Sequence, residues 1–340
     1  MESAVMFLAG LIGLAAIGGA AYAIGDAFAS DEDLDSGEGE TPAELPKGEF
    51  LDVGENIDAP EMPLSAEGKV VSEFQGDLVI AGEDGNDVLT GQDGNDQING
   101  YAGDDLIHGS AGNDVLHGST GADALYGGTG HDVLHGEADD DVLWGNEGDD
   151  RLLGHFGADH LSGGAGADTA FGGQGDDTLS GDGGDDALHG GYGDDRLAGG
   201  EGQDVLFGGD GDDVLSGTDD GAASQADFLN GGDGEDILIA GGEDILTGGR
   251  GADEFILKSD NSDEKVTIMD FQPDEDRLLI AWDSQTDPDI RIETDAANTN
   301  LTRIMIDGEE VAHLYGAAGI TPEHVELITG AELAQYGQTT

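Results

Sequence analysis

The sequence predicts an all-β solenoid, because one nine-residue pattern repeats without a gap over residues 82–216. The 135 residues of this stretch divide into fifteen copies of Gly-x-x-Gly-x-Asp-x-Leu-x. Position one is Gly and position six is Asp in every copy. Position four is Gly except at Asp139, and position eight is Leu or Ile except at Ala170. One apolar residue per copy cannot form a core alone, so the copies must stack on one another.

The pattern also indicates how each copy folds. Gly at positions one and four permits positive φ and close approach of the backbone, so positions one to six are predicted to form a turn. Positions seven to nine, as in Val88-Leu89-Thr90, alternate outward, inward and outward, which predicts a short strand. Stacking would place the Asp carboxylates in rows about 5 Å apart, where like charges repel. A hard cation that prefers oxygen ligands resolves this conflict, and Ca²⁺ is the leading candidate.

The copies resemble the calcium-binding nonapeptide Gly-Gly-x-Gly-x-Asp-x-U-x of RTX (hemolysin-type) proteins. The resemblance implies a right-handed parallel β-roll in which two copies make one turn and each ion lies between the loops of successive turns. Carbonyls at positions two and four would join the Asp of one copy, and carbonyls at positions one and three would join the Asp two copies later. The residues around one such ion would be Gly128, Gly130, Asp132, Gly145, Glu147 and Asp150.

The resemblance assigns ligands along the whole repeat, with up to thirteen ions in the regular roll because fifteen copies give thirteen pairs two copies apart. The Asp side chains would be Asp87, Asp96, Asp105, Asp114, Asp123, Asp132, Asp141, Asp150, Asp159, Asp168, Asp177, Asp186, Asp195, Asp204 and Asp213. The position-four carbonyls would be those of Gly85, Gly94, Gly103, Gly112, Gly121, Gly130, Gly148, Gly157, Gly166, Gly175, Gly184, Gly193, Gly202 and Gly211. Position two is Gly in only six copies, so backbone strain or weaker sites are expected in the first half, and Asp139 puts the site of its own copy in question.

Beyond residue 216 the phase slips and then recovers. Residues 217–230 carry five extra residues, residues 240–247 are one short, and residues 231–239 and 248–256 keep the pattern. The Asp of each of these copies is also assigned as a metal ligand, namely Asp227, Asp236, Asp244 and Asp253.

The sequence after residue 254 predicts a β-rich cap. Strands are expected at residues 255–257, 266–269, 278–282, 290–292, 301–306 and 311–315. Asp307-Gly308 predicts a hairpin, and Thr321-Pro322 predicts the start of a short helical turn. Phe255, residues 266–271 and residues 276–279 together resemble the cap that follows the roll in serralysin-type RTX proteases.

The N-terminal part differs from the repeat. Residues 4–25 are uncharged and would span about 33 Å as a helix, enough to cross a bilayer. Residues 1–29 are therefore predicted to be either a membrane anchor or a signal segment, cleaved after Ala27-Phe28-Ala29 in the second case. Residues 30–73 form an acidic, Pro-containing linker, residues 74–256 the roll with a capping strand at 74–81, and residues 257–340 the cap.

Composition limits the function. With 76 acidic and 10 basic residues the net charge is −66, which argues against nucleic acid and anionic membrane surfaces as partners and favours cations. The lack of Cys excludes disulfides and Cys-based zinc sites. The sequence holds no His-Glu-x-x-His, Gly-x-Ser-x-Gly or phosphate-loop motif, so no catalytic residue and no enzyme activity are predicted.

One row of outward side chains remains. Side chains at position nine of alternate copies are predicted to lie in a row on one outer face. This row is expected to contact the cap, a partner or another copy; alternatively, its members are scattered surface residues without a common role. Its members are His117, His135, Leu153, Phe171, His189 and Phe207.

These observations predict an extracellular or cell-surface module that binds Ca²⁺, folds on binding it, and serves a structural or interaction role. Residues 4–25 are one expected point of contact with a membrane. The sequence does not identify which protein or glycan would be a further partner. Two alternatives stay open: an RTX-associated hydrolase or epimerase, and an adhesin or surface-layer component.

Overall fold

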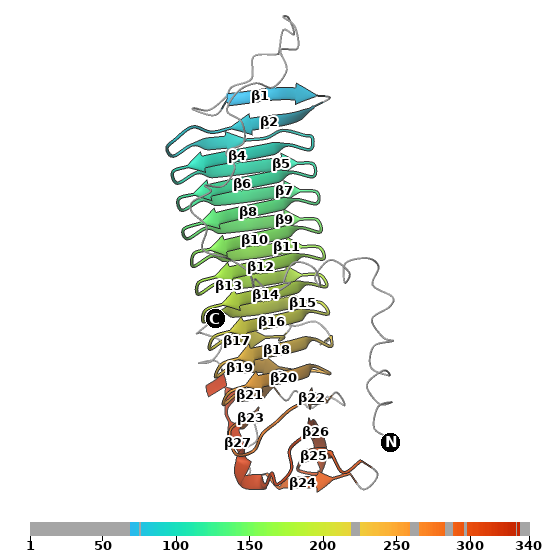
Figure 1. Cartoon of the computed structure of the whole chain (residues 1–340). Helices are drawn as coiled ribbons and strands as arrows, with labels where there is room; N and C mark the ends of the chain where they lie inside the picture. The colour runs from blue at the N-terminus through green and yellow to red at the C-terminus, as the bar shows by residue number, and fades with distance from the viewer. Residues whose placement is uncertain are drawn as a thin grey trace, which may run out of the picture. The chain divides into compact units, whose positions relative to one another are not determined.

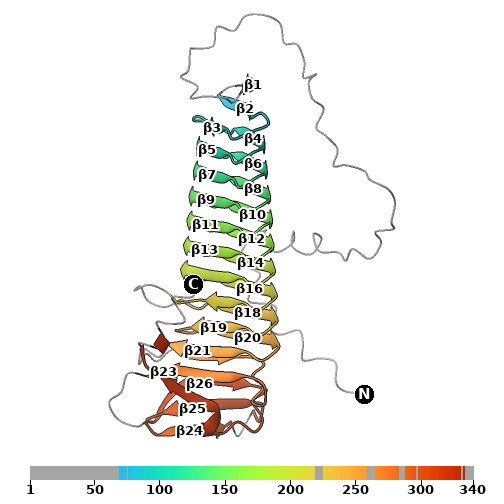
Figure 2. The same ribbon diagram turned by 90° about the vertical axis from the view of Figure 1, so that its left-hand side faces the viewer.

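The repeat folds into two parallel β-sheets that face each other across a narrow core (Figures 1 and 2). The computed structural model describes residues 69–74, 76–218, 225–258, 265–282, 288–295, 298–330 and 332–333. All of them belong to the unit formed by residues 62–340. Successive copies alternate between the sheets, so two copies complete one turn, as the resemblance implied. The predicted all-β parallel solenoid is therefore confirmed.

The first sheet has fifteen strands. In spatial order they are β1 (Lys69–Phe74), β2 (Asp77–Ala81), β4 (Gln97–Ala102), β6 (Val115–Thr120), β8 (Val133–Ala138), β10 (Arg151–Phe156), β12 (Thr169–Gln174), β14 (Ala187–Tyr192), β16 (Val205–Asp210), β18 (Phe228–Asp233), β20 (Ile245–Arg250), β22 (Val266–Ile268), β26 (Glu309–Tyr315), β25 (Leu301–Ile306) and β24 (Ile290–Thr294).

The second sheet has twelve strands. In spatial order they are β27 (Val325–Ile328), β23 (Arg277–Ala281), β21 (Glu254–Lys258), β19 (Ile237–Ala240), β17 (Val214–Ser216), β15 (Arg196–Glu201), β13 (Thr178–Gly183), β11 (His160–Ala165), β9 (Val142–Glu147), β7 (Ala124–Thr129), β5 (Leu106–Ala111) and β3 (Val88–Thr90).

The strand register keeps each position of the repeat in a straight row. In the regular part, partners on neighbouring strands are eighteen residues apart, as where Leu152 of β10 lies opposite Ala170 of β12. The irregular copies keep the same rows, because Leu229 lies opposite Leu206 on one side and Leu246 on the other. The extra and missing residues are thus absorbed between strands, and the predicted recovery of the phase is confirmed.

The strands are longer than predicted. A full strand such as β6 has six residues and covers positions seven to nine and then one to three of the next copy, so only positions four to six turn. Of the two reasons expected for Gly at position one, close approach applies and positive φ does not: a Cβ at Gly145 would clash with Asp150 Oδ2 and with the Gly163 carbonyl. Position four does need positive φ, as at Gly148 with φ 129°. Close packing fixes the first glycine. At the second, positive φ acts together with packing, because a Cβ at Gly148 would clash with the Gly130 carbonyl.

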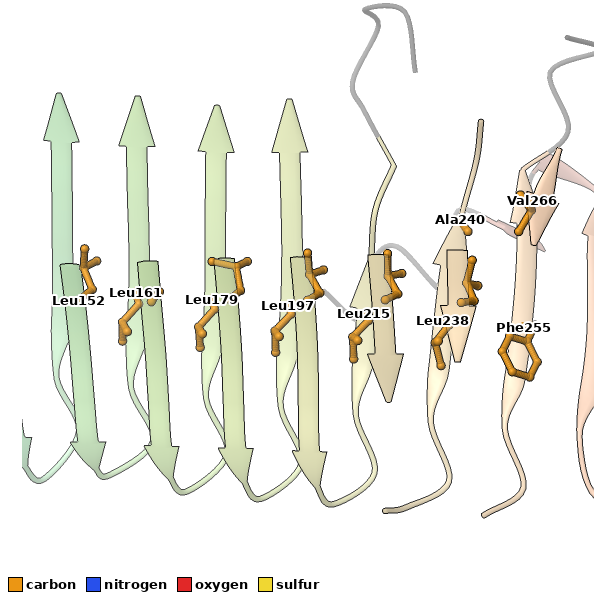
Figure 3. Close-up of a cluster of buried hydrophobic side chains, with 14 of the residues drawn as sticks. Leu152, Leu161, Leu179, Leu197, Leu215, Leu238, Ala240, Phe255 and Val266 are labelled. Carbon is orange, nitrogen blue, oxygen red and sulfur yellow. The ribbon is translucent and has the colours of Figure 1, made fainter. Parts of the chain in front are cut away.

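The core is a double ladder of position-eight side chains. Leu161, Leu179, Leu197 and Leu215 lie in a row on successive strands of the second sheet (Figure 3), and each is at most 1% exposed. The first sheet contributes a matching ladder. Because each turn adds one leucine-sized residue from each sheet, the core is continuous along the roll but thin across it.

The cap continues both sheets instead of covering a face. β22 pairs in parallel with β20, β23 with β21, and β27 with β23. The predicted hairpin at Asp307-Gly308 is confirmed, since it joins antiparallel β25 and β26 with φ of 54° and 87° at its two residues. Thr321 precedes the 3₁₀ turn η1 (Pro322–His324), as predicted. Two strands were not predicted: β27, and β1, of which all but Phe74 lies in the range assigned to the linker.

In the described part of the chain, no helix is long and apolar enough to cross a membrane. The stretch at residues 4–25 and most of the linker lie outside the described residues. Their assignments as an N-terminal helix, anchor or signal segment and as a linker therefore stay predictions.

The two leucines of β10 offer a matched test of the core. Leu152 is fully buried, whereas its neighbour Leu153 points outward and is partly exposed. We expect Leu152→Ala to lower the free energy of unfolding by about 2–5 kcal/mol, because it opens a cavity in the ladder. Leu153→Ala should lower it by less than about 1 kcal/mol. Urea unfolding at saturating Ca²⁺ measures both, and equal losses would contradict the inward ladder.

Candidate metal centre

The predicted Asp ligands are buried in two columns. All of the position-six Asp residues from Asp87 to Asp253 are only 0–4% exposed, including the four after residue 216. Those that directly precede strands of the first sheet, from Asp96 to Asp244, form the first column. Those that precede strands of the second sheet, from Asp87 to Asp253, form the second column. Acidic side chains are rarely buried to this extent without a partner for their charge.

One carboxylate oxygen of each Asp ties neighbouring turns together. The Asp132 backbone N–H donates to Asp150 Oδ1 at 2.7 Å, one turn further along. The same bond recurs through both columns at 2.7–3.1 Å, from the Asp87 N–H donating to Asp105 down to the Asp236 N–H donating to Asp253. This bond explains why the Asp must hold one register in every copy.

The other carboxylate oxygen is left without a hydrogen bond through most of the roll. An ionised oxygen buried in this way is costly unless a cation neutralises it. Oδ2 has no hydrogen-bond partner in Asp105, Asp114, Asp123, Asp132, Asp141, Asp150, Asp159, Asp168, Asp177, Asp186, Asp195, Asp213 and Asp236.

Backbone carbonyls supply the remaining oxygens around these carboxylates. The space beside Gly145 is bounded by Asp150 Oδ2 and by the Gly163 carbonyl, and Gly181 lies in the same way between Asp186 Oδ2 and the Gly199 carbonyl. In the described residues no three His, Cys, Asp or Glu side chains converge as a metal-binding group. A cation beside Asp150 Oδ2 and the Gly163 carbonyl would meet oxygen ligands, which suit Ca²⁺.

The backbone at position two decides whether Oδ2 is satisfied. In the first two copies the N–H groups of Glu83 and Gln92 donate to the Oδ2 atoms of Asp87 and Asp96, both at 2.7 Å, and neither donor has positive φ. The other non-glycine residues at this position all have φ between 69° and 91°, and no such bond forms. They are Tyr101, Ser110, Ser119, Glu137, Asn146, His155 and Asp182.

This conformation is costly for residues with a Cβ, by about 1–2 kcal/mol each. Five of the seven strained residues lie in the first eight of the fifteen copies, so the strain predicted for the first half is present. The predicted position-four glycines all have positive φ, and Asp139 takes the same conformation with φ 76°. The backbone path of the Asp139 copy is therefore kept, with Asp141 in its column.

Both columns are closed at their far ends by backbone donors. Asp244 Oδ2 accepts the Gly241 N–H at 2.8 Å at the end of the first column. In the second column Asp276, which was not predicted, accepts the Asp253 N–H through Oδ1 at 3.2 Å and the Gln272 N–H through Oδ2 at 2.7 Å. Asp276-Arg277-Leu278 repeats the Asp-x-Leu of the nonapeptide, and this signal identifies Asp276 in the sequence.

Burial raises the pKa of many carboxylates in the middle of the columns well above the ordinary value of 3.8. Desolvation is the largest cause, and neighbouring Asp carboxylates add to it. Burial with Asp159 and Asp195 nearby raises the pKa of Asp177 to about 8, and burial raises the pKa of Asp123 to about 7 and that of Asp150 to about 6. The metal-free roll therefore holds protons at pH values where an unfolded chain has released them.

Comparison with protein families now identifies the repeat. The model of the RTX calcium-binding nonapeptide repeat matches residues 81–220 and 222–255, which is just over half of the chain. The chain belongs to the family of RTX calcium-binding nonapeptide-repeat proteins.

Two solved structures are similar to parts of the chain. The AlgE6R3 subunit of a mannuronan C5-epimerase from Azotobacter vinelandii is 23% identical over 44% of this chain and 81% of its own, with a TM-score of 0.29. The extracellular lipase LipA from Serratia marcescens is 17% identical over 66% of this chain and 45% of its own, with a TM-score of 0.21. Comparison with curated proteins gives no match.

The raised pKa values predict how pH acts on the metal-free protein. A group whose folded pKa is raised contributes stability below its unfolded pKa and loses it as pH rises through the folded pKa. We therefore expect the metal-free roll to lose stability as pH rises through about 6 to 8, where the carboxylates of Asp150, Asp123 and Asp177 ionise. Far-UV circular dichroism of the chain freed of divalent ions should show more β structure near pH 5.5 than at pH 8. The opposite order would contradict buried, unneutralised carboxylates.

The strain at position two can be tested at Ser110, which has φ 91°. Ser110→Gly should raise the free energy of unfolding by about 1 kcal/mol, because glycine adopts this conformation without steric cost. Ser110→Ala is the control, since it removes the same hydroxyl and keeps the strain. Urea unfolding at a fixed Ca²⁺ concentration compares them, and equal stability of the two variants would show that the backbone is unstrained there.

Proposed function

We propose that this chain is a calcium-responsive roll that folds outside the cell and there serves a structural or interaction role. The proposal rests on the two columns of buried Asp carboxylates. Along each column the Oδ2 atoms lack hydrogen bonds, whereas at the column ends backbone N–H groups donate to Oδ2. Positive φ at residues such as Tyr101 and Glu137 accompanies this arrangement at a cost in stability. Bound cations give a physical reason for retaining such an arrangement.

Each ion would lie between two successive carboxylates of one column. For Asp132 and Asp150, the carbonyls carried over from the family are those of Gly128, Gly130 and Gly145, with that of Glu147 as the fourth. Thirteen such ions would add 26 positive charges to the net charge of −66 and leave about −40. The loaded roll would stay strongly acidic, which favours solubility.

The response to calcium would be a folding switch. Extracellular calcium modules bind with Kd on the order of 10⁻⁴ to 10⁻³ M, so the roll would be unfolded at cytosolic calcium and folded outside. In this arrangement residues 1–29 would direct or attach the chain, residues 30–73 would be a spacer, residues 74–256 would form the roll, and residues 257–340 would close it.

A titration tests the proposal directly. Far-UV circular dichroism of the chain from residue 30 at pH 8 should show a cooperative gain of β structure with Ca²⁺. Mg²⁺ at the same concentration should give little, because its smaller octahedral shell does not suit a site built from many carbonyls. Full β structure in the absence of divalent ions, or none at saturating Ca²⁺, would overturn the proposal.

Two adjacent aspartates provide a charge-matched test. Asp177 is fully buried in the second column, whereas Asp176 beside it lies outside the columns and accepts the Asp194 N–H. Asp177→Asn keeps an oxygen for the Asp159 N–H. It weakens two ion sites, each worth about 2.7 kcal/mol when Ca²⁺ is at 100 times Kd. The free energy of unfolding should therefore fall by up to about 5 kcal/mol. Asp176→Asn should change it little, and equal effects would argue against ligation by the columns.

A further inference from the structure

Three histidines lie side by side on the outer face of the first sheet. His117, His135 and His155 come from the adjacent strands β6, β8 and β10. The rings of His117 and His135 are stacked with centroids 4.5 Å apart, and those of His135 and His155 with centroids 5.4 Å apart. Glu137 lies two residues after His135 on the same strand face. All four side chains are partly exposed, so a solute can reach them.

The register of the roll explains this grouping. Position nine of one copy and position two of the next are two residues apart, so both point outward from one strand. Position-nine side chains then meet position-two side chains of the next strand in the same sheet. His117 contacts Glu137 in this way, and His135 contacts His155. The row predicted along this face is thus present, and the cap extends the sheet beyond its end instead of covering it.

The contact between the two imidazoles has the dimensions of a metal site. His135 Nδ1 and His155 Nε2 are 3.1 Å apart, and these two nitrogens can share only one proton. Two imidazole nitrogens bound to one tetrahedral Zn²⁺ at 2.0–2.1 Å would lie about 3.3 Å apart. A zinc ion could therefore replace that proton after a small movement of the rings. His117 Nδ1 and Glu137 Oε1, which are 3.0 Å apart, add a nitrogen and a carboxylate on the same face.

Two of the four residues also have a strained backbone. Glu137 and His155 occupy position two with φ of 84° and 77°, where six other copies have glycine. Glycine would remove the steric cost at both residues, but it would also remove the carboxylate and one imidazole from this face. Five other non-glycine residues at position two share this conformation, so Glu137 and His155 are distinguished by the carboxylate and the imidazole that they place on this face.

We propose that His135 and His155, with Glu137 and His117 as the further ligands, bind a divalent ion of the zinc class on the outer face of the roll. Imidazole nitrogens suit Zn²⁺, whereas the all-oxygen columns suit Ca²⁺, so one roll carries two chemically distinct kinds of site. The four groups are joined as two hydrogen-bonded pairs and do not yet converge on one point. Binding therefore requires rotation of the side chains, and it would link three successive turns of the first sheet.

Equilibrium dialysis of the full chain with Zn²⁺ at saturating Ca²⁺ tests the proposal. The wild-type chain should bind one Zn²⁺ ion with higher affinity than all further Zn²⁺ ions. His135→Ala combined with His155→Ala should lower that affinity by at least about tenfold, because it removes two of the four ligands. His189→Ala is the matched control, since His189 is at position nine of the same face on β14 and should leave the affinity unchanged. Far-UV circular dichroism in Ca²⁺ verifies that each variant is folded.

Two further readouts separate this site from the acidic surface. Co²⁺ in place of Zn²⁺ should give the intense visible absorption of tetrahedral nitrogen ligation, and the double variant should lose it. Glu137→Gln, which keeps the side-chain size, should weaken binding less than loss of both histidines. Equal Zn²⁺ affinity of the wild type and the double variant, or uptake of Zn²⁺ only with release of Ca²⁺, would overturn the proposal. If the calcium titration failed but the chain were folded, the comparison of Zn²⁺ affinity between the wild type and the double variant would still test the zinc site.

Discussion

The structure depends on one carboxylate buried in every copy of the repeat. From Asp96 onward, Oδ1 of the Asp accepts an N–H from the preceding turn, which fixes the register of neighbouring strands. The space that the carboxylate occupies excludes a Cβ at position one, so the first glycine follows from the aspartate. The same burial leaves Oδ2 with no hydrogen bond in Asp132, Asp150 and their equivalents. Stacking, glycine spacing and the need for a cation thus have a common cause.

Magnitudes show why the hydrophobic ladder cannot hold this fold alone. Burial of one leucine stabilises a protein by about 1.5–3 kcal/mol, and each copy supplies only one. An ionised carboxylate taken out of water costs several kcal/mol unless it is neutralised. Ordering nine backbone residues per copy costs more again. The free energy of folding at neutral pH therefore depends on what neutralises the carboxylates of the columns. The leucines determine only how successive turns of the roll pack.

Much of this structure follows from the nonapeptide spacing, and what does not follow depends on single backbone groups. The period places Leu161 inward and Asp159 in its column, because both are fixed by the position in the copy. Closure of the column ends could not be predicted, since it rests on the direction of the Glu83 and Gln272 N–H groups. The strand length was underestimated, because position one accommodates Asp packing and does not turn. Contacts between side chains twenty residues apart, such as His135 and His155, need the register of the sheet as well as the period.

The alternation of copies between two sheets has a consequence for how such a chain can change its length. Removal or duplication of two copies, eighteen residues, would shift the later turns along the axis and return every side chain to its own sheet and column. Duplication of a single copy would send all later strands to the opposite sheet, exchanging the two outer faces and the strand on which the cap is built. Growth of the roll by whole turns therefore preserves its surface, whereas growth by half a turn inverts it.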